Sequence, residues 1–281
     1  MRTALRLLSK HAILSAGLLL LALPVGAQGG AIPLTIRPRA GDTLRLRMDQ
    51  TVEMAATRRN GDVDVTTSEQ HTMVVLTRVA VESTDLDGAT VTAMTDTVRL
   101  TSTDGSAGSS LLGWARVMQG QRFRFRVLTD GSTALVDASK GAPQVAAFLA
   151  QLPASLPKEP IAPGRTWSRS MDIPISALSD ARGTASMTAT FRFDSVTRGG
   201  DLAYLSVRGR LTRQSAPPKG SVAPTVEMNG TLSGSVVVDR RRGWITDARS
   251  LISTHSLVSS PKGDTPPVRI RLKITQWMRA Q

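Results

Sequence analysis

The regular alternation of apolar and polar side chains is the feature of this sequence that most constrains its fold. Between residues 43 and 53, most even positions from Leu44 to Val52 are apolar, whereas the odd positions from Arg45 to Glu53 are polar. Successive side chains of a β-strand point to opposite faces, so a period of two places one set against a core and the other in solvent. The segment is therefore predicted to be a half-buried strand.

The same pattern recurs along most of the chain. Turn dipeptides separate the segments, among them Asn60-Gly61, Asp87-Gly88 and Asp130-Gly131, which accept the positive φ angles of tight hairpins. Together with the first segment, strands are predicted at residues 43–53, 71–82, 89–100, 122–127, 132–136, 166–173, 184–196, 202–212, 225–238, 244–257 and 268–278. The predicted fold class is mainly all-β, with one large antiparallel sheet.

One segment has a helical period instead. In residues 142–152 the apolar side chains recur at i, i+3, i+4 and i+7, which places them on one face of a helix. Pro143 suits the first turn of this helix, and Pro153 ends it. A single amphipathic helix beside many strands is expected to cover one face of the sheet with these side chains: Val145, Phe148, Leu149 and Leu152.

The N-terminal segment 1–27 has the three parts of a cleavable signal peptide. Basic residues at its start precede an apolar run at 13–23, and small residues lead up to Ala27. A retained membrane anchor is the alternative, but the run is much shorter than the ~20 apolar residues of a membrane-spanning helix. We therefore expect export to the periplasm or the exterior, with a mature protein that is soluble.

Cysteine is absent from the chain. This absence excludes disulfides, thiol catalysis and thiolate metal sites, and it excludes a lipoprotein, which needs a cysteine at its cleavage site. Stability must therefore come from a packed core. Because aromatic residues make up only 4% of the chain, that core is predicted to be mainly aliphatic.

After the signal peptide, residues 28–40 are predicted to be an exposed, flexible leader, and residues 41–281 a single β-rich domain. An internal duplication within that domain, with halves 41–152 and 164–281, is one hypothesis. Segments starting at Gly41 and Gly164 share Gly, Thr, Met and Asp at one offset. Shared turn chemistry is the other explanation of this match, and both stay open.

The chain is strongly basic, with a formal net charge of +13. A positive net charge of this size is typical of proteins that bind nucleic acid. Here, however, the cations are spread along the predicted strands, and the sequence contains neither a zinc-finger spacing nor a recognition helix. We therefore expect no nucleic-acid partner. The same charge predicts a weak affinity for anionic envelope surfaces, such as lipid headgroups or polysaccharide.

No pattern in the sequence indicates catalysis. Ser155 and Lys158 have the S-x-x-K spacing of acyl-serine enzymes, but the surrounding prolines prevent the helix that this motif requires. A Ser-His-Asp triad would have to use His71 or His255, and each lies in a strand pattern where a structural histidine is usual. Zinc sites without cysteine recruit several histidines, and H-E-x-x-H is absent. We expect no catalytic residue, no cofactor and no metal.

Tryptophans at strand ends are the remaining candidates for a site. Trp167 opens a predicted strand, and Trp244 follows a turn. Aromatic side chains in such places either close the end of a core or line the mouth of a ligand site, and both interpretations stay open. The candidate ligand-lining set is therefore Trp167 and Trp244, together with Val145, Phe148, Leu149 and Leu152 of the predicted helix.

The run from Pro160 to Trp167 resembles the strand entry P-V-x-P-G-D-x-W of an uncharacterised family of secreted bacterial β-rich proteins. The Gly41-Asp42-Thr43 entry and the strand that opens at Gly243-Trp244 are similar to that family too, although Arg165 replaces its usual acid. The family has no assigned activity. The resemblance implies a large curved antiparallel sheet akin to the half-barrels of periplasmic lipoprotein carriers, which hold helices on the concave face.

Three functions are consistent with these observations. The first is a non-catalytic cell-envelope protein that binds a lipid-like or amphipathic ligand between sheet and helix. The second is a structural or assembly module that docks another envelope protein. The third is a hydrolase of envelope polymers, which would require carboxylates or a Ser–His pair brought together by the fold.

Overall fold

Eleven β-strands make up almost all regular structure in the computed structural model, which describes residues 30–103, 116–138, 155–174, 184–215, 225–260 and 265–281. The strands are β1 (Thr43–Asn60), β2 (Val63–Thr84), β3 (Gly88–Ser102), β4 (Arg122–Leu128), β5 (Thr133–Ala138), β6 (Thr166–Pro174), β7 (Thr184–Val196), β8 (Leu202–Ser215), β9 (Thr225–Asp239), β10 (Trp244–Ser259) and β11 (Val268–Ala280). The predicted all-β class is confirmed, with a strand at every predicted position. The predicted signal peptide and helix 142–152 lie outside the described residues.

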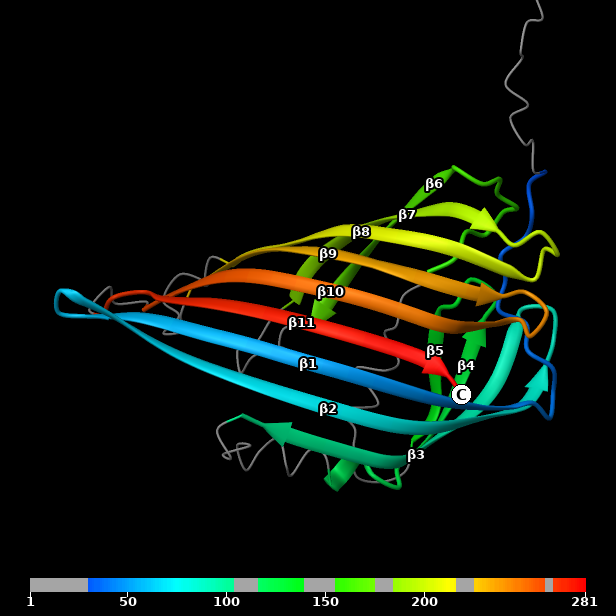
Figure 1. Cartoon of the computed structure of the whole chain (residues 1–281), viewed down its shortest axis with the longest axis horizontal. Helices are drawn as coiled ribbons and strands as arrows, with labels where there is room; N and C mark the ends of the chain where they lie inside the picture. The colour runs from blue at the N-terminus through cyan, green and yellow to red at the C-terminus, as the bar shows by residue number, and fades with distance from the viewer. Residues whose placement is uncertain (1–29, 104–115, 139–154, 175–183, 216–224, 261–264) are drawn as a thin grey trace, which may run out of the picture.

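The strands form one antiparallel sheet in the order β5-β4-β3-β2-β1-β11-β10-β9-β8-β7-β6 (Figure 1). Its centre is the pairing of β1 with β11, which runs from Leu46 opposite Ala280 to Arg58 opposite Val268. All other neighbours are consecutive along the chain and antiparallel.

The sheet is open, with β5 and β6 as its edge strands. Alternating the direction outward from the central pair makes these two strands run parallel to each other. The sheet curves, so that β4–β5 and β6–β7 lie behind the central strands in Figure 1.

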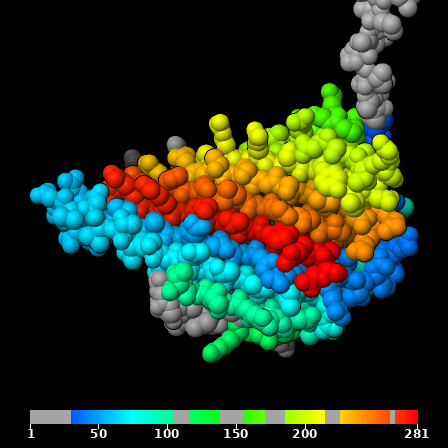
Figure 2. Space-filling model, viewed as in Figure 1, coloured from blue at the N-terminus to red at the C-terminus, as the bar shows by residue number. Residues whose placement is uncertain are grey.

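The two faces of the sheet differ sharply in character. Leu44 and its alternate neighbours along β1 point to the concave face, and Arg45 and its alternate neighbours point to the convex face. Register carries this division across the sheet, so that Val52 lies between His71 and Ile274, whereas Glu53 lies between Gln70 and Lys273. The convex face of the central strands is turned toward the viewer in Figure 2.

The main core fills the concave side at one end of the sheet. Its fully buried members include Phe123 from β4, Phe193 from β7 and Val238 from β9. The segment before β1 also contributes, because Leu34 and Ile36 are only 1% and 2% exposed.

The structure thus differs from the exposed leader predicted at residues 28–40. Ile32 bridges Ile161, and the Ile36 amide donates to the Thr129 carbonyl at 2.9 Å. These backbone bonds tie the segment across the end of the sheet. Leu34 and Ile36 cover core residues that the open sheet alone would leave in water, and this burial stabilises the segment.

The backbones of β9 and β10 approach closely at Gly234. Gly234 lies opposite Val207 and Ser250, and a Cβ atom there would lie 2.2 Å from the Arg249 carbonyl oxygen. Any other residue would push β9 and β10 apart at this point. The close approach of the two strands therefore requires glycine here.

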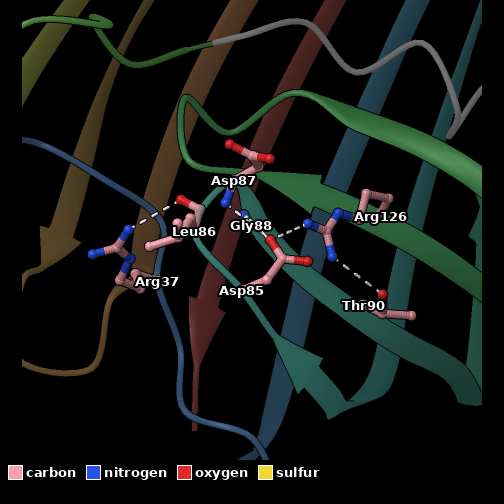
Figure 3. A network of polar contacts seen from close by, with 7 residues as sticks. All are labelled: Arg37, Asp85, Leu86, Asp87, Gly88, Thr90 and Arg126. Carbon is pink, nitrogen blue, oxygen red and sulfur yellow. Dashed lines mark hydrogen bonds and ion pairs between the residues drawn. The ribbon is translucent and has the colours of Figure 1, made fainter.

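The β2–β3 turn is held by a polar network around Asp85 (Figure 3). The Asp85 carboxylate accepts hydrogen bonds from the amides of Asp87 and Gly88, at 2.9 and 3.1 Å, and from the Arg126 guanidinium of β4. The bond from Arg126 contributes most to holding the pKa of Asp85 below its usual value, with help from the Asp87 amide.

We predict that Gly234→Ala lowers the free energy of unfolding by about 1–3 kcal/mol, because the new methyl group overlaps the Arg249 carbonyl. Urea denaturation measures the change. Gly199→Ala is the matched control, since a Cβ at Gly199 meets only Asp201, at 4.0 Å. Equal stability of the two variants would contradict close packing at Gly234.

We also predict a pH-dependent effect of Asp85→Asn. A lowered pKa in the folded state means that the Asp85 contribution is fully present above about pH 4, the pKa of an unfolded aspartate. It is lost as the pH falls through the folded pKa. Urea midpoints of the wild type and variant should differ at pH 7, and the difference should shrink as the pH falls below about 4. A gap that widens with acid would contradict the network.

Candidate functional site

The candidate site is the concave face of the central strands, beyond the main core. Apolar side chains cross this face in rows set by the strand register. Val52 of β1 lies beside Ile274 of β11, which lies beside Ile252 of β10 and then Leu232 of β9. One register step further along, Met54 lies beside Leu272.

These rows form an apolar strip outside the main core cluster, and the polar row of Gln50, Gln276 and Ser250 lies on the same face between the strip and that core. Ile274 is buried, whereas Val52, Met54 and Ile252 are only half-buried. Methionines are frequent on this concave face: Met48, Met54, Met73, Met187, Met228 and Met278. Methionine adapts its shape to what it packs against, which makes such a face suited to ligands of variable form.

A few polar atoms interrupt this apolar surface. His71 of β2 lies directly opposite Ser102 of β3. The His71 Nδ1 atom and the Ser102 hydroxyl are buried, and neither has a hydrogen-bond partner among the residues that the structure describes. Arg169 of β6 has an unpartnered Nε, although its Nη2 donates to the Leu156 carbonyl at 2.9 Å. Buried polar groups in proteins are normally hydrogen-bonded, so these atoms are available to a bound polar group.

The residues around His71 do not form a nucleophilic relay. Glu69 lies 3.4 Å from His71 Nε2, so a carboxylate, an imidazole and a hydroxyl follow one another on neighbouring strands. A relay also requires the imidazole to accept from the hydroxyl, and no hydrogen bond joins His71 to Ser102. His255 lies across the sheet on the exposed convex face, opposite Arg271.

The two predicted site tryptophans pack at the edge of the core. Trp167 stacks on Phe191 with ring centroids 5.5 Å apart, and its indole N–H donates to the Ser155 carbonyl at 3.2 Å. Trp244 packs against the main core cluster. Their role in lining a ligand stays a prediction.

Val145, Phe148, Leu149 and Leu152 lie outside the described residues. Sequence reasoning did not select the concave residues Met54, Ile252 and Leu272, although the alternation that predicted the strands was the signal that could have placed them on one face.

Another tryptophan occupies the convex face. Trp277 of β11 is held between the guanidinium groups of Arg249 and Arg279, 4.4 and 4.1 Å from the ring centroid. Its indole N–H donates to Asp247 at 2.8 Å. The two arginines of this cluster already have acidic partners, because Arg249 lies near Asp247 and Arg279 lies near Asp49.

Within the described ranges, no group of three or more His, Asp or Glu side chains is placed to hold a metal ion. Over the same residues, no helix has the length and apolar character of a membrane-spanning segment.

Fold and site together define an all-β protein with one open antiparallel sheet and an apolar concave face. Residues 114–245 match DUF6263, a family of unknown function, which is consistent with the predicted resemblance to an uncharacterised family. A comparison with curated proteins found no match. Among solved structures, the chain is similar to the COG4313 outer membrane channel from Pseudomonas putida F1, with 8% sequence identity and a TM-score of 0.21. The match covers 86% of this chain and 96% of the channel chain. A likeness that weak carries no argument.

We predict that Ser102→Ala increases the stability of the ligand-free protein, by up to about 1 kcal/mol, because it removes a buried hydroxyl that has no partner. Ser132→Ala is the contrasting control. The Ser132 hydroxyl bonds the Asp130 carboxylate at 2.6 Å, so its loss should cost about 1 kcal/mol. Chemical denaturation measures both changes, and a destabilised Ser102→Ala protein would contradict the assignment.

Proposed function

We propose that this protein is a non-catalytic, exported cell-envelope protein that binds a lipid-like or amphipathic ligand against the concave face of its sheet. The observation that carries the proposal is the strip of apolar side chains on the concave face outside the main core, together with nearby buried polar atoms that have no hydrogen-bond partner among the described residues. Small-molecule sites have this composition: a mainly apolar lining with a few polar groups that fix the orientation of the ligand.

The energetics favour a ligand with a long hydrocarbon part. Each methylene group removed from water contributes about 0.8 kcal/mol, so a chain laid along the rows from Met54 to Ile252 gains affinity with length. A polar head near His71 and Ser102 would supply the hydrogen bonds that these two residues lack. An amphipathic ligand therefore matches both parts of the face.

The compartment in this proposal rests on the segment 1–27, whose basic start, apolar run and small residues before Gln28 match an export signal. A carrier of lipid-like molecules has a role in the periplasm or at the cell exterior, where apolar molecules must cross water between surfaces. Nucleic acid is not a partner in this proposal.

The test is binding of a fluorescent long-chain fatty acid to Met54→Asp. A carboxylate at this half-buried concave position would lie against the hydrocarbon chain, and we expect the affinity to fall at least about 10-fold. Ala55→Asp is the matched control, because it adds the same charge to the same strand on the convex face, beside Arg271. Its affinity should equal that of the wild type.

Lipid extraction from natively purified protein provides a second measurement. Mass spectrometry should detect an amphipathic molecule bound in stoichiometric amount, and less of it in Met54→Asp than in Ala55→Asp. The proposal fails if the purified protein contains no such molecule and the fatty acid binds both variants as it binds the wild type.

A further inference from the structure

A second site lies at one end of the central strands, near the start of β1 and the end of β9. It is a pocket of about 470 Å³ lined by the turn before β1, the turn between β9 and β10, and the last residue of the chain: Arg39, Asp42, Thr43, Leu44, Arg241, Arg242 and Gln281. This volume falls within the range of small-molecule sites in proteins. Apart from Leu44, which also belongs to the main core, the pocket shares no residue with the concave rows.

Backbone contacts bring the two turns together. The Arg37 amide donates to the Gly243 carbonyl at 2.8 Å. A Cβ atom at Gly243 would lie only 2.2 Å from the Arg37 carbonyl oxygen, so this contact requires glycine. The contact places Arg39, two residues after Arg37, on the same pocket as Arg241 and Arg242.

Each turn is closed by its own acid. The Asp42 amide donates to the Arg39 carbonyl, and the Asp42 carboxylate accepts from the Arg39 amide at 3.2 Å. Asp239 does the same for the other turn, because its carboxylate accepts from the Arg242 amide at 2.9 Å. Both carboxylates therefore accept hydrogen bonds from backbone amides. These bonds fix the backbone positions from which the arginine side chains extend.

The guanidinium groups in the pocket are poorly neutralised. Among the described residues, Arg39 and Arg241 take part in no ion pair, and Arg242 approaches Asp239 only at 3.7 Å. The side chains that line the pocket include three arginines and one carboxylate, that of Asp42.

A neighbouring hollow of about 320 Å³ shares Gln281 and adds Arg45 and Arg78. The Nε and Nη2 atoms of Arg78 donate to the Asp96 carboxylate, whereas Arg45 has no ion-pair partner among the described residues. The basic surface thus continues from the pocket onto the convex face.

We propose that the arginine pocket binds a phosphate-type anion, either a free phosphate or the phosphate of a lipid headgroup. Guanidinium groups form paired hydrogen bonds with phosphate oxygens, and several on fixed turns bind one anion better than isolated surface cations do. Because Arg242 and Asp239 are 3.7 Å apart, little free energy is lost when the Arg242 guanidinium turns from this carboxylate to a phosphate. This function does not depend on ligand binding at the concave face.

The experiment compares Arg39→Gln/Arg241→Gln with Arg269→Gln/Arg271→Gln in the full chain. Both double variants remove two positive charges, but the second pair lies on the convex face of β11, away from the pocket. Binding to inorganic phosphate is measured by calorimetry. Binding to vesicles of phosphatidylcholine, with and without phosphatidylglycerol, is measured by co-sedimentation.

We expect the pocket variant to lose at least about 10-fold in affinity for one of these probes, while the β11 variant loses less than about 2-fold. Loss confined to vesicles that contain phosphatidylglycerol identifies the headgroup as the source, and loss of phosphate binding identifies a free anion. Equal losses in the two variants would show general surface charge and overturn the proposal. Failure of the wild type to bind either probe would overturn it too.

Two further measurements separate this proposal from other causes. Gly243→Ala removes no charge but displaces the Arg37 backbone, so a folded Gly243→Ala protein should lose anion binding as the pocket variant does. Retained binding by this folded variant would contradict the pocket. Fatty-acid binding by Arg39→Gln/Arg241→Gln should equal that of the wild type, which distinguishes failure at the pocket from failure at the concave face.

Discussion

The pairing of β1 with β11 is the interaction on which the rest of the structure depends. It joins the beginning and the end of the domain along thirteen residue pairs, from Leu46–Ala280 to Arg58–Val268, and thereby converts two runs of hairpins into one sheet. It also fixes the strand directions so that β5 and β6 cannot meet as an antiparallel pair. The single sheet, with β5 and β6 as its two edges, depends on this one contact.

The two faces of the open sheet carry different kinds of side chain. The concave side holds a packed core at one end, where Leu34 and Ile36 complete it, and an apolar surface along the central strands, which is the surface proposed to bind a ligand. The convex side holds most of the paired charges, and the arginine pocket lies at its margin. The proposed ligand face and the proposed anion pocket therefore lie on different parts of the sheet.

The strands could be predicted because the alternation with a period of two can be seen in consecutive residues of the sequence. Two other kinds of feature could not be predicted. Residues 63–70 of β2 are exposed on both faces, so no alternation marks them, and only their backbone ladder with β1 makes them a strand. Contacts between segments far apart in the sequence could not be predicted either. The burial of Leu34 and the approach of Arg39 to Arg241 correspond to no pattern in the residues next to them in the chain. The meeting of His71 with Ser102 depends likewise on register, which includes a bulge in the β2–β3 pairing.

The central pair also sets the order in which the chain can fold. Gln276 and Met48, which touch across it, are 228 positions apart, so β1 must wait for nearly the whole chain before its second neighbour exists. Until then one edge of β1 presents free amides and carbonyls to any extended chain nearby. Pairings of such long range are slow to form, and their exposed intermediates tend to aggregate. A chaperone that shields β1 during synthesis would therefore raise the yield of folded protein, and moving the chain ends elsewhere by circular permutation would reduce that need.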